Sequence, residues 1–239
     1  MEVIDVRTMF GSWPKRPLEL SAADLASHLC GLGIAQAVTT SSMAVLYDDA
    51  AGNAETLAQC ACQPSLIPAA TIHPHDYLGS EGAVGALREQ GFSLFRLFNR
   101  LQGFSLDLYC LRLLLADLAR AGLPCIVDAV ALEDAYKLAR LSRDTGAALI
   151  CTNLGYTFEA EIIAIAKEFP LVYYDAGRMT SPDGIALFCR DVGAHRLVYG
   201  SDYPFDDVLP SLLLLQHASV SPAELELIAS GTIRELLHL

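Results

Sequence analysis

The feature of this 239-residue chain that most restricts its fold is the regular alternation of short, continuously apolar segments with longer amphipathic ones. Apolar runs of this kind are typical of parallel strands that helices cover. They lie at residues 3–6, 35–39, 66–72, 93–98, 125–128, 148–153, 171–175 and 196–202. Segments with helical periodicity or helix-capping residues separate them and follow the last one. The sequence therefore predicts repeated strand–helix units of the α/β class.

The number of these units favours a closed (β/α)8 TIM barrel, which typically needs about 250 residues. An open, doubly wound parallel sheet is the alternative. We expect a single domain over residues 1–239, because no linker, low-complexity segment or repeat divides the chain. Neither a dinucleotide-binding glycine pattern nor a P-loop pattern occurs.

Composition narrows the partners and the location. The formal net charge of −12 argues against nucleic acid and anionic membranes as partners. The chain has no apolar run near the roughly 18 residues of a membrane span, and residues 1–6 lack the features of a secretion signal. The seven cysteines are an odd number, which favours free thiols and a cytoplasmic location. Cys60 and Cys62 point apart if they lie on a helix, which disfavours a metal pair.

Polar side chains gather at the expected carboxyl ends of the strands, where the active site of such a barrel lies. The last strand ends on Asp202, within Gly200-Ser201-Asp202-Tyr203-Pro204. The other polar candidates at or after strand ends include Arg7, His73, His75, Arg96, Asn99, Arg100, Asp128, Asn153, Asp175 and Arg178. Several arginines in one concave site suit a small molecule that carries a carboxylate. Trp13, Tyr156 and Tyr203 are expected to line this site or to pack the loops around it.

Several segments, in this order and spacing, resemble the amidohydrolase superfamily, specifically its amidohydrolase-related (type 2) branch of metal-dependent (β/α)8 hydrolases and decarboxylases. The matching segments are Ile4-Asp5-Val6, the stretch 95–104, Gly122-Leu123-Pro124, Gly200 to Pro204 and the helix at 227–237. The resemblance runs from Ile4 to the C-terminus. It implies the closed barrel and hydrolase chemistry.

The resemblance also implies a metal site, but this chain departs from its pattern. The family binds divalent ions through H-x-H on the first strand, a histidine each on the fifth and sixth, and an aspartate on the eighth. Here the H-x-H positions read Arg7-Thr8-Met9, and the two later histidine positions hold Asp128 and Asn153. Only Asp202 remains, and a guanidinium stays protonated and repels a metal ion. We therefore expect a degenerate metal site and no cofactor. The alternative is a single divalent metal in a relocated site near His73 and His75.

Two classes of function follow. The first is a lactonase-like amidohydrolase that hydrolyses a lactone, ester or amide of a small carboxylate-bearing molecule without a metal. In this hypothesis Asp202 is the general base, Arg7 supplies the positive charge of the missing ion, and Asp128 and Asn153 complete the catalytic set. The expected substrate-binding residues are Arg96, Asn99, Arg100, Arg178, His73, His75, Tyr203 and Trp13.

The second class is a catalytically inactive barrel that binds a small anion or a protein partner. In that case an Arg7–Asp202 salt bridge fills the metal position and serves stability alone. Apart from either class, the plain structural interpretation of Asp175 and Arg178 is that they pair with each other. Barrels of this kind can form homodimers, and the sequence leaves that open.

Overall fold

The strands form one nine-stranded sheet that curls on itself. The computed structural model describes residues 1–14, 17–79, 82–129, 131–155, 157, 159–181 and 183–239. The strands are β1 (Ile4–Trp13), β2 (Leu18–Leu20), β3 (Gln36–Ser41), β4 (Leu66–Ala70), β5 (Leu94–Leu97), β6 (Cys125–Asp128), β7 (Leu149–Thr152), β8 (Val172–Asp175) and β9 (Leu197–Val198). Their order is β2-β1-β3-β4-β5-β6-β7-β8-β9. Every pair is parallel except the antiparallel β1–β2 hairpin.

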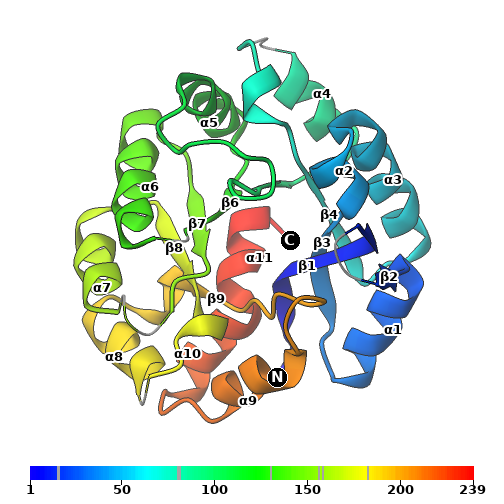
Figure 1. Ribbon diagram of the computed structural model, residues 1–239. Coiled ribbons are helices and arrows are strands. Elements are labelled where there is room, and N and C mark those ends of the chain that lie inside the picture. The colour runs from blue at the N-terminus through cyan, green and yellow to red at the C-terminus, as the bar shows by residue number, and fades with distance from the viewer. Residues whose placement is uncertain (15–16, 80–81, 130, 156, 158, 182) are drawn as a thin grey trace.

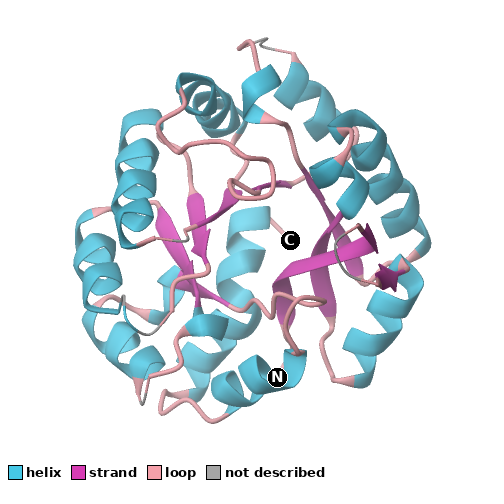
Figure 2. Ribbon diagram, viewed as in Figure 1, coloured by secondary structure: helices cyan, strands magenta, loops and turns pink. Residues whose placement is uncertain are grey.

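Helices surround the sheet (Figures 1 and 2). They are α1 (Ala22–Gly31), α2 (Ser42–Leu46), α3 (Asp49–Cys62), α4 (Ala83–Glu89), α5 (Tyr109–Ala121), α6 (Leu132–Thr145), α7 (Glu159–Glu168), α8 (Gly184–Asp191), α9 (Val208–Gln216), α10 (Pro222–Glu226) and α11 (Thr232–Leu237). Within the described residues, no helix is both long and apolar enough to cross a bilayer. The α/β class and the helix-covered parallel sheet predicted from the sequence are therefore confirmed.

Successive side chains along a strand point to opposite faces of the sheet, so the strands contribute residues to two cores. The outer core fills the space between sheet and helices. The inner core contains Ile4, Val6, Val38, Ile67, Ala69, Leu94, Ile126, Ile150 and Val198. Ile233 and Leu237 of α11 pack against these inner residues, and α11 lies in the middle of the helix ring in Figure 1. Residues that precede β6, β7 and β8 lie beside α11, so this helix covers the end where strands begin. The opposite end, where strands finish, carries the polar groups.

The structure differs from the sequence prediction mainly at the first and last strands. β1 continues to Trp13 because its second half pairs with β2, from Gly11 opposite Leu20 to Trp13 opposite Leu18. The last strand ends at Val198 rather than at Asp202, because its parallel partner β8 ends at Asp175, opposite Val198. Asp202 itself has a left-handed φ of 66°. All seven cysteines are free, and α3 buries Cys60 while it exposes Cys62, as expected.

Candidate active site

Arg7 is the centre of the polar group at the strand ends. Its guanidinium lies 3.1 Å from the Asp175 carboxylate, through Nη1, and 2.7 Å from the Asp202 carboxylate, through Nη2. Nη2 also donates to the side-chain oxygen of Asn153. The Arg7 side chain is only 1% exposed, so β1 places a full positive charge in the interior. Its partners come from β8, from the residue that follows β7 and from the segment after β9. The pairing of Arg7 with Asp202, which the sequence predicted, is confirmed.

Three arginine side chains contact the Asp202 carboxylate. Besides Arg7, Nη2 of Arg178 lies 3.4 Å away and Nη2 of Arg96 lies 3.8 Å away. The Asp202 side chain keeps 13% exposure, whereas that of Asp175 keeps 1%. Burial raises the pKa of Asp202 above its ordinary value, although Arg7, Arg96 and Arg178 act to lower it. Asp202 is therefore a partly accessible carboxylate that takes up a proton more readily than an ordinary aspartate.

Arg96 joins this charged group to an apolar wall. It is buried on β5, donates to the Thr8 carbonyl oxygen at 2.9 Å, and its guanidinium carbon lies 4.4 Å from the Phe98 ring centre. Phe98 forms a small apolar cluster with Met9 and Val45, against which Trp13, Leu46 and Phe205 pack. A ligand beside Asp202 would thus have cations next to its charged end and apolar groups next to its body. We call Arg7, Arg96, Asn153, Asp175, Arg178 and Asp202 the Arg7–Asp202 centre.

The negative charge of Asp128 acts on the groups of this centre. It ends β6 and accepts a hydrogen bond from the Thr152 hydroxyl at 2.6 Å. Its charge acts to raise the pKa values of Arg7 and Asp202. The structure therefore places Asp128 near the centre, with its carboxylate held by β7.

The remaining described residues of the predicted site have other contacts. The backbone of His73 donates to Asp49, and its ring centre lies 5.4 Å from that of the exposed His75. Tyr203 stacks on His28 of α1 at 4.6 Å, and Asn99 accepts from the backbone of the exposed Arg100. Trp13 meets Phe205 edge-on at 4.6 Å. Tyr156 lies outside the described residues.

The expected pairing of Asp175 with Arg178 is wrong, since Arg7 rather than Arg178 is the hydrogen-bonded partner of Asp175. Arg178 instead contacts Asp202 and Asp206. The signal for Asp175 was present, because it ends a strand as Asp128 does. Asp206 gave no such signal, since it lies in the loop before α9.

Asp5 is a further carboxylate that the sequence did not single out for the site. It is fully buried, and its Oδ1 accepts from the backbone N–H groups of Arg7 and Ser201, both at 3.0 Å. Its Oδ2 has no hydrogen-bond partner among the described residues. Asp5 thus ties the backbone of Arg7 to the residue before Asp202. Burial raises its pKa to about 6.

Replacing Asp5 by Asn is expected to stabilise the protein most at high pH. Because the native pKa of Asp5 lies above 3.8, its unfolded value, the native state binds the proton more tightly, and that contribution is lost as pH rises through about 6. Raising the pKa of Asp5 from 3.8 to about 6 corresponds to about 3 kcal/mol. Asn cannot ionise, yet its amide oxygen still serves both backbone donors. The free energy of unfolding of the variant should therefore exceed the wild-type value by up to about 3 kcal/mol at pH 8, and by less at pH 4.

Urea denaturation at pH 4, 6 and 8 measures this difference. Asp76→Asn, at an exposed position, controls for the loss of one charge. A difference between Asp5→Asn and wild type that stays constant from pH 4 to pH 8 would show that Asp5 does not titrate in this range.

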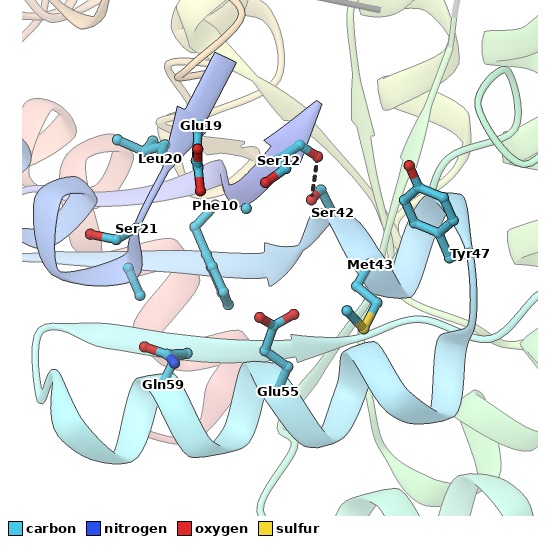
Figure 3. Close-up of a pocket in the computed structure, with 12 residues that line it drawn as sticks. Phe10, Ser12, Glu19, Leu20, Ser21, Ser42, Met43, Tyr47, Glu55 and Gln59 are labelled. Atoms are coloured by element: carbon cyan, nitrogen blue, oxygen red, sulfur yellow. Dashed lines mark hydrogen bonds between the residues drawn. The ribbon is translucent and has the colours of Figure 1, made fainter. Parts of the chain in front are cut away.

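A separate pocket of about 280 Å³ lies between the β1–β2 hairpin and α3 (Figure 3). Its lining includes Phe10 and the carboxylates Glu19 and Glu55, and the Glu55 side chain rises from α3 toward Phe10. Among the described residues that line it, none is a lysine or an arginine. The two carboxylates, Glu19 and Glu55, disfavour an anionic ligand there, in contrast to the Arg7–Asp202 centre.

Sequence comparison identifies the relatives of the chain. The family described as Amidohydrolase matches residues 13–239. The chain belongs to the amidohydrolase family. The resemblance found in the sequence is thereby confirmed, although the matched range begins after Arg7. Searched against curated proteins, the chain has no match.

Several solved structures share the fold of this protein over its whole chain. A dihydroxybenzoic acid decarboxylase from Polaromonas sp. JS666 has a TM-score of 0.80 and 13% identity, with 100% of this chain and 97% of that chain covered. A 5-carboxyvanillate decarboxylase from Novosphingobium aromaticivorans has a TM-score of 0.79 and 13% identity, with 100% and 96% covered. An uncharacterised TIM-barrel protein from Bordetella bronchiseptica has a TM-score of 0.75 and 18% identity, with 100% and 99% covered. At these identities the likeness establishes the fold alone.

The expectation that the amidohydrolase has no cofactor is contradicted by these comparisons. The decarboxylases from Polaromonas and Novosphingobium were both crystallised with bound manganese, which points to a metal cofactor in proteins of this fold. The side chains at the Arg7–Asp202 centre do not fit such an ion in their present arrangement. In the described part of the chain, no three His, Cys, Asp or Glu side chains converge as metal ligands. The Arg7 guanidinium lies between Asp175 and Asp202, where it would repel a second cation.

Proposed function

We propose that this protein is an enzyme that acts on a small carboxylate-bearing molecule at the Arg7–Asp202 centre. The observation that carries the proposal is the contact of one partly accessible carboxylate, Asp202, with three arginines. A purely structural ion pair needs one partner, and buried pairs add little net stability. The apolar wall around Phe98 supports a substrate with an apolar or aromatic body.

Hydrolysis of a lactone, ester or amide is the reaction that we propose first. Asp202 would take a proton from water, whose oxygen then bonds to the carbonyl carbon. Arg96 and Arg7 would stabilise the negative charge that develops on the carbonyl oxygen. Collapse of the intermediate breaks the bond to the leaving oxygen or nitrogen, which receives the proton from Asp202. The raised pKa of Asp202 suits both proton transfers.

Decarboxylation is the second candidate, because two structural neighbours are decarboxylases of small aromatic carboxylates. In that reaction a protonated Asp202 would deliver its proton to the ring carbon that loses carbon dioxide. The raised pKa of Asp202 and the apolar wall are compatible with this reaction as well.

We also propose that the chain forms a single domain in which the sheet closes as a (β/α)8 barrel. Two contacts support the closure. The backbone N–H of Val6 donates to the Tyr199 carbonyl oxygen at 2.9 Å, and that of Met9 donates to the Tyr203 carbonyl oxygen at 3.1 Å. A parallel bridge between Thr8 and Tyr203 adds to them.

A combined stability and turnover screen tests the proposed function. Purified protein is heated with hydroxybenzoates, dicarboxylates, sugar acids and lactones, with and without added manganese, and product formation is followed by mass spectrometry. We expect carboxylates to raise the melting temperature by a few degrees, as ligands that bind the native state do. Arg178→Gln should reduce this rise, because Arg178 is the most exposed of the three arginines. Arg112→Met, whose side chain is half exposed on α5, should preserve it. Stabilisation without turnover would favour the inactive, anion-binding barrel. The absence of both stabilisation and turnover would contradict the proposal.

A further inference from the structure

The three arginines that contact Asp202 are not equally free to bind a ligand. Arg7 and Arg96 are 1% and 3% exposed and hold partners in the interior. Turning either one toward a ligand would leave a buried carboxylate or carbonyl without its donor, which is costly. The Arg178 side chain is 40% exposed. Among the three, Arg178 can therefore change partners at the lowest cost.

The second partner of Arg178 is Asp206, whose side chain is 44% exposed. Backbone contacts fix both members of this pair. Arg178 ends a short 3-10 turn, Ala176–Arg178, in which the Asp175 side chain accepts from the Gly177 N–H at 2.8 Å. Asp206 and Phe205 both donate their N–H groups to the Asp202 carbonyl oxygen, at 3.2 and 2.8 Å. The backbone of Asp206, four residues after Asp202, is thus held where its partly exposed carboxylate pairs with Arg178.

We propose that the Asp206 carboxylate occupies the position on Arg178 that a ligand carboxylate takes, and that ligand binding displaces it. This inference rests on the proposed function and identifies Asp206 as the residue that sets the affinity for carboxylates. The exchange keeps Arg178 paired throughout. Asp206 is exposed, so its release into water costs little, because exposed ion pairs contribute about 1 kcal/mol or less.

The exchange also explains how a ligand would reach the reacting group. Arg178 contacts Asp202 at 3.4 Å, so a carboxylate bound to Arg178 brings the rest of the ligand beside Asp202 and the Phe98 wall. A neutral ligand cannot replace the negative charge of Asp206 on Arg178. The pair therefore selects carboxylates over amides of the same shape.

Isothermal titration of the full-length protein with benzoate tests the inference, with benzamide as the neutral analogue. Asp206→Asn removes the competing charge and leaves Arg178 in place. Asp207→Asn is the matched control, because it changes the same charge one residue away. The Asp207 side chain accepts from the Leu209 N–H at the start of α9, a role that Asn also performs. Arg178→Gln removes the proposed binding group.

We expect Asp206→Asn to bind benzoate about fivefold more tightly than wild type, and Asp207→Asn to stay within about twofold. Arg178→Gln should bind benzoate about tenfold more weakly, and benzamide should respond to neither Asp206→Asn nor Arg178→Gln. Equal gains in Asp206→Asn and Asp207→Asn would overturn the inference, since net charge alone would then explain them. Benzoate binding that neither Asp206→Asn nor Arg178→Gln alters would also overturn it, while it would leave the proposed function standing. Failure of the proposed function is recognised separately, by the absence of both turnover and stabilisation in the compound screen.

Discussion

Replacement of Arg7 by methionine is expected to lower the free energy of unfolding by about 3–5 kcal/mol at pH 7. The change leaves the Asp175 and Asp202 carboxylates beside each other without the cation that lies between them. It also removes the donor to Asn153. Methionine fills a similar volume and has no charge, so most of the loss reports on the uncompensated carboxylates rather than on a cavity. Urea denaturation followed by circular dichroism measures the effect.

Two further variants separate charge from packing. In the double variant Arg7→Met with Asp175→Asn, the buried negative charge at 1% exposure is gone, so part of the lost stability should return. Arg112→Met removes an arginine from an exposed ion pair and should cost about 1 kcal/mol or less. A loss as small as this in Arg7→Met would mean that Arg7 is not the group that compensates the interior carboxylates.

Replacement of Asp202 by asparagine is expected to lower kcat by about 10²–10⁴-fold for any substrate that the compound screen identifies. Asparagine keeps the shape of Asp202 and can still accept from Arg178 and Arg96, but it cannot take up or release a proton at neutral pH. KM should change less than kcat, because the arginines that would bind the substrate carboxylate remain. Steady-state kinetics of the purified variant measure both values.

Asp107→Asn is the control for this experiment, because Asp107 pairs with Lys137 at an exposed position on the outer surface. It should retain the wild-type kcat. Full activity of Asp202→Asn would remove Asp202 from the proton-transfer role and leave it as a structural partner of Arg7.

The fold could be predicted because short apolar strands and capped helices are local patterns. The hairpin partner of β1 could not be predicted, since β2 is three residues long and its pairing depends on register. The helix α2 could not be predicted either, because Ser41 both ends β3 and caps α2, so no loop residue separates the strand from the helix.

One contact of the candidate site, between Arg7 and Asp202, could be predicted from the order of the strands. First and last strands of a barrel adjoin, so Arg7 and Asp202 were expected to meet, and they do. The pairing of Asp175 with Arg178, its neighbour in the chain, is wrong, because the parallel sheet brings the end of β8 to Arg7 on β1. Asp5 gave no chemical signal, because it stands between Ile4 and Val6 and its hydrogen-bond donors are backbone groups. The expectation of no cofactor is contradicted by two decarboxylases of the same fold that were crystallised with bound manganese, which the residues at the ligand positions of this chain do not indicate.

The central claim is that a carboxylate-bearing small molecule binds and reacts at the Arg7–Asp202 centre. A crystal structure of the protein with the most strongly stabilising carboxylate from the screen tests it most directly. We predict that the carboxylate lies within about 3.2 Å of the Arg178 guanidinium, with the body of the molecule between Asp202 and Phe98. A carboxylate bound instead in the pocket beside Glu19 and Glu55, with Arg178 still paired to Asp206, would contradict the claim.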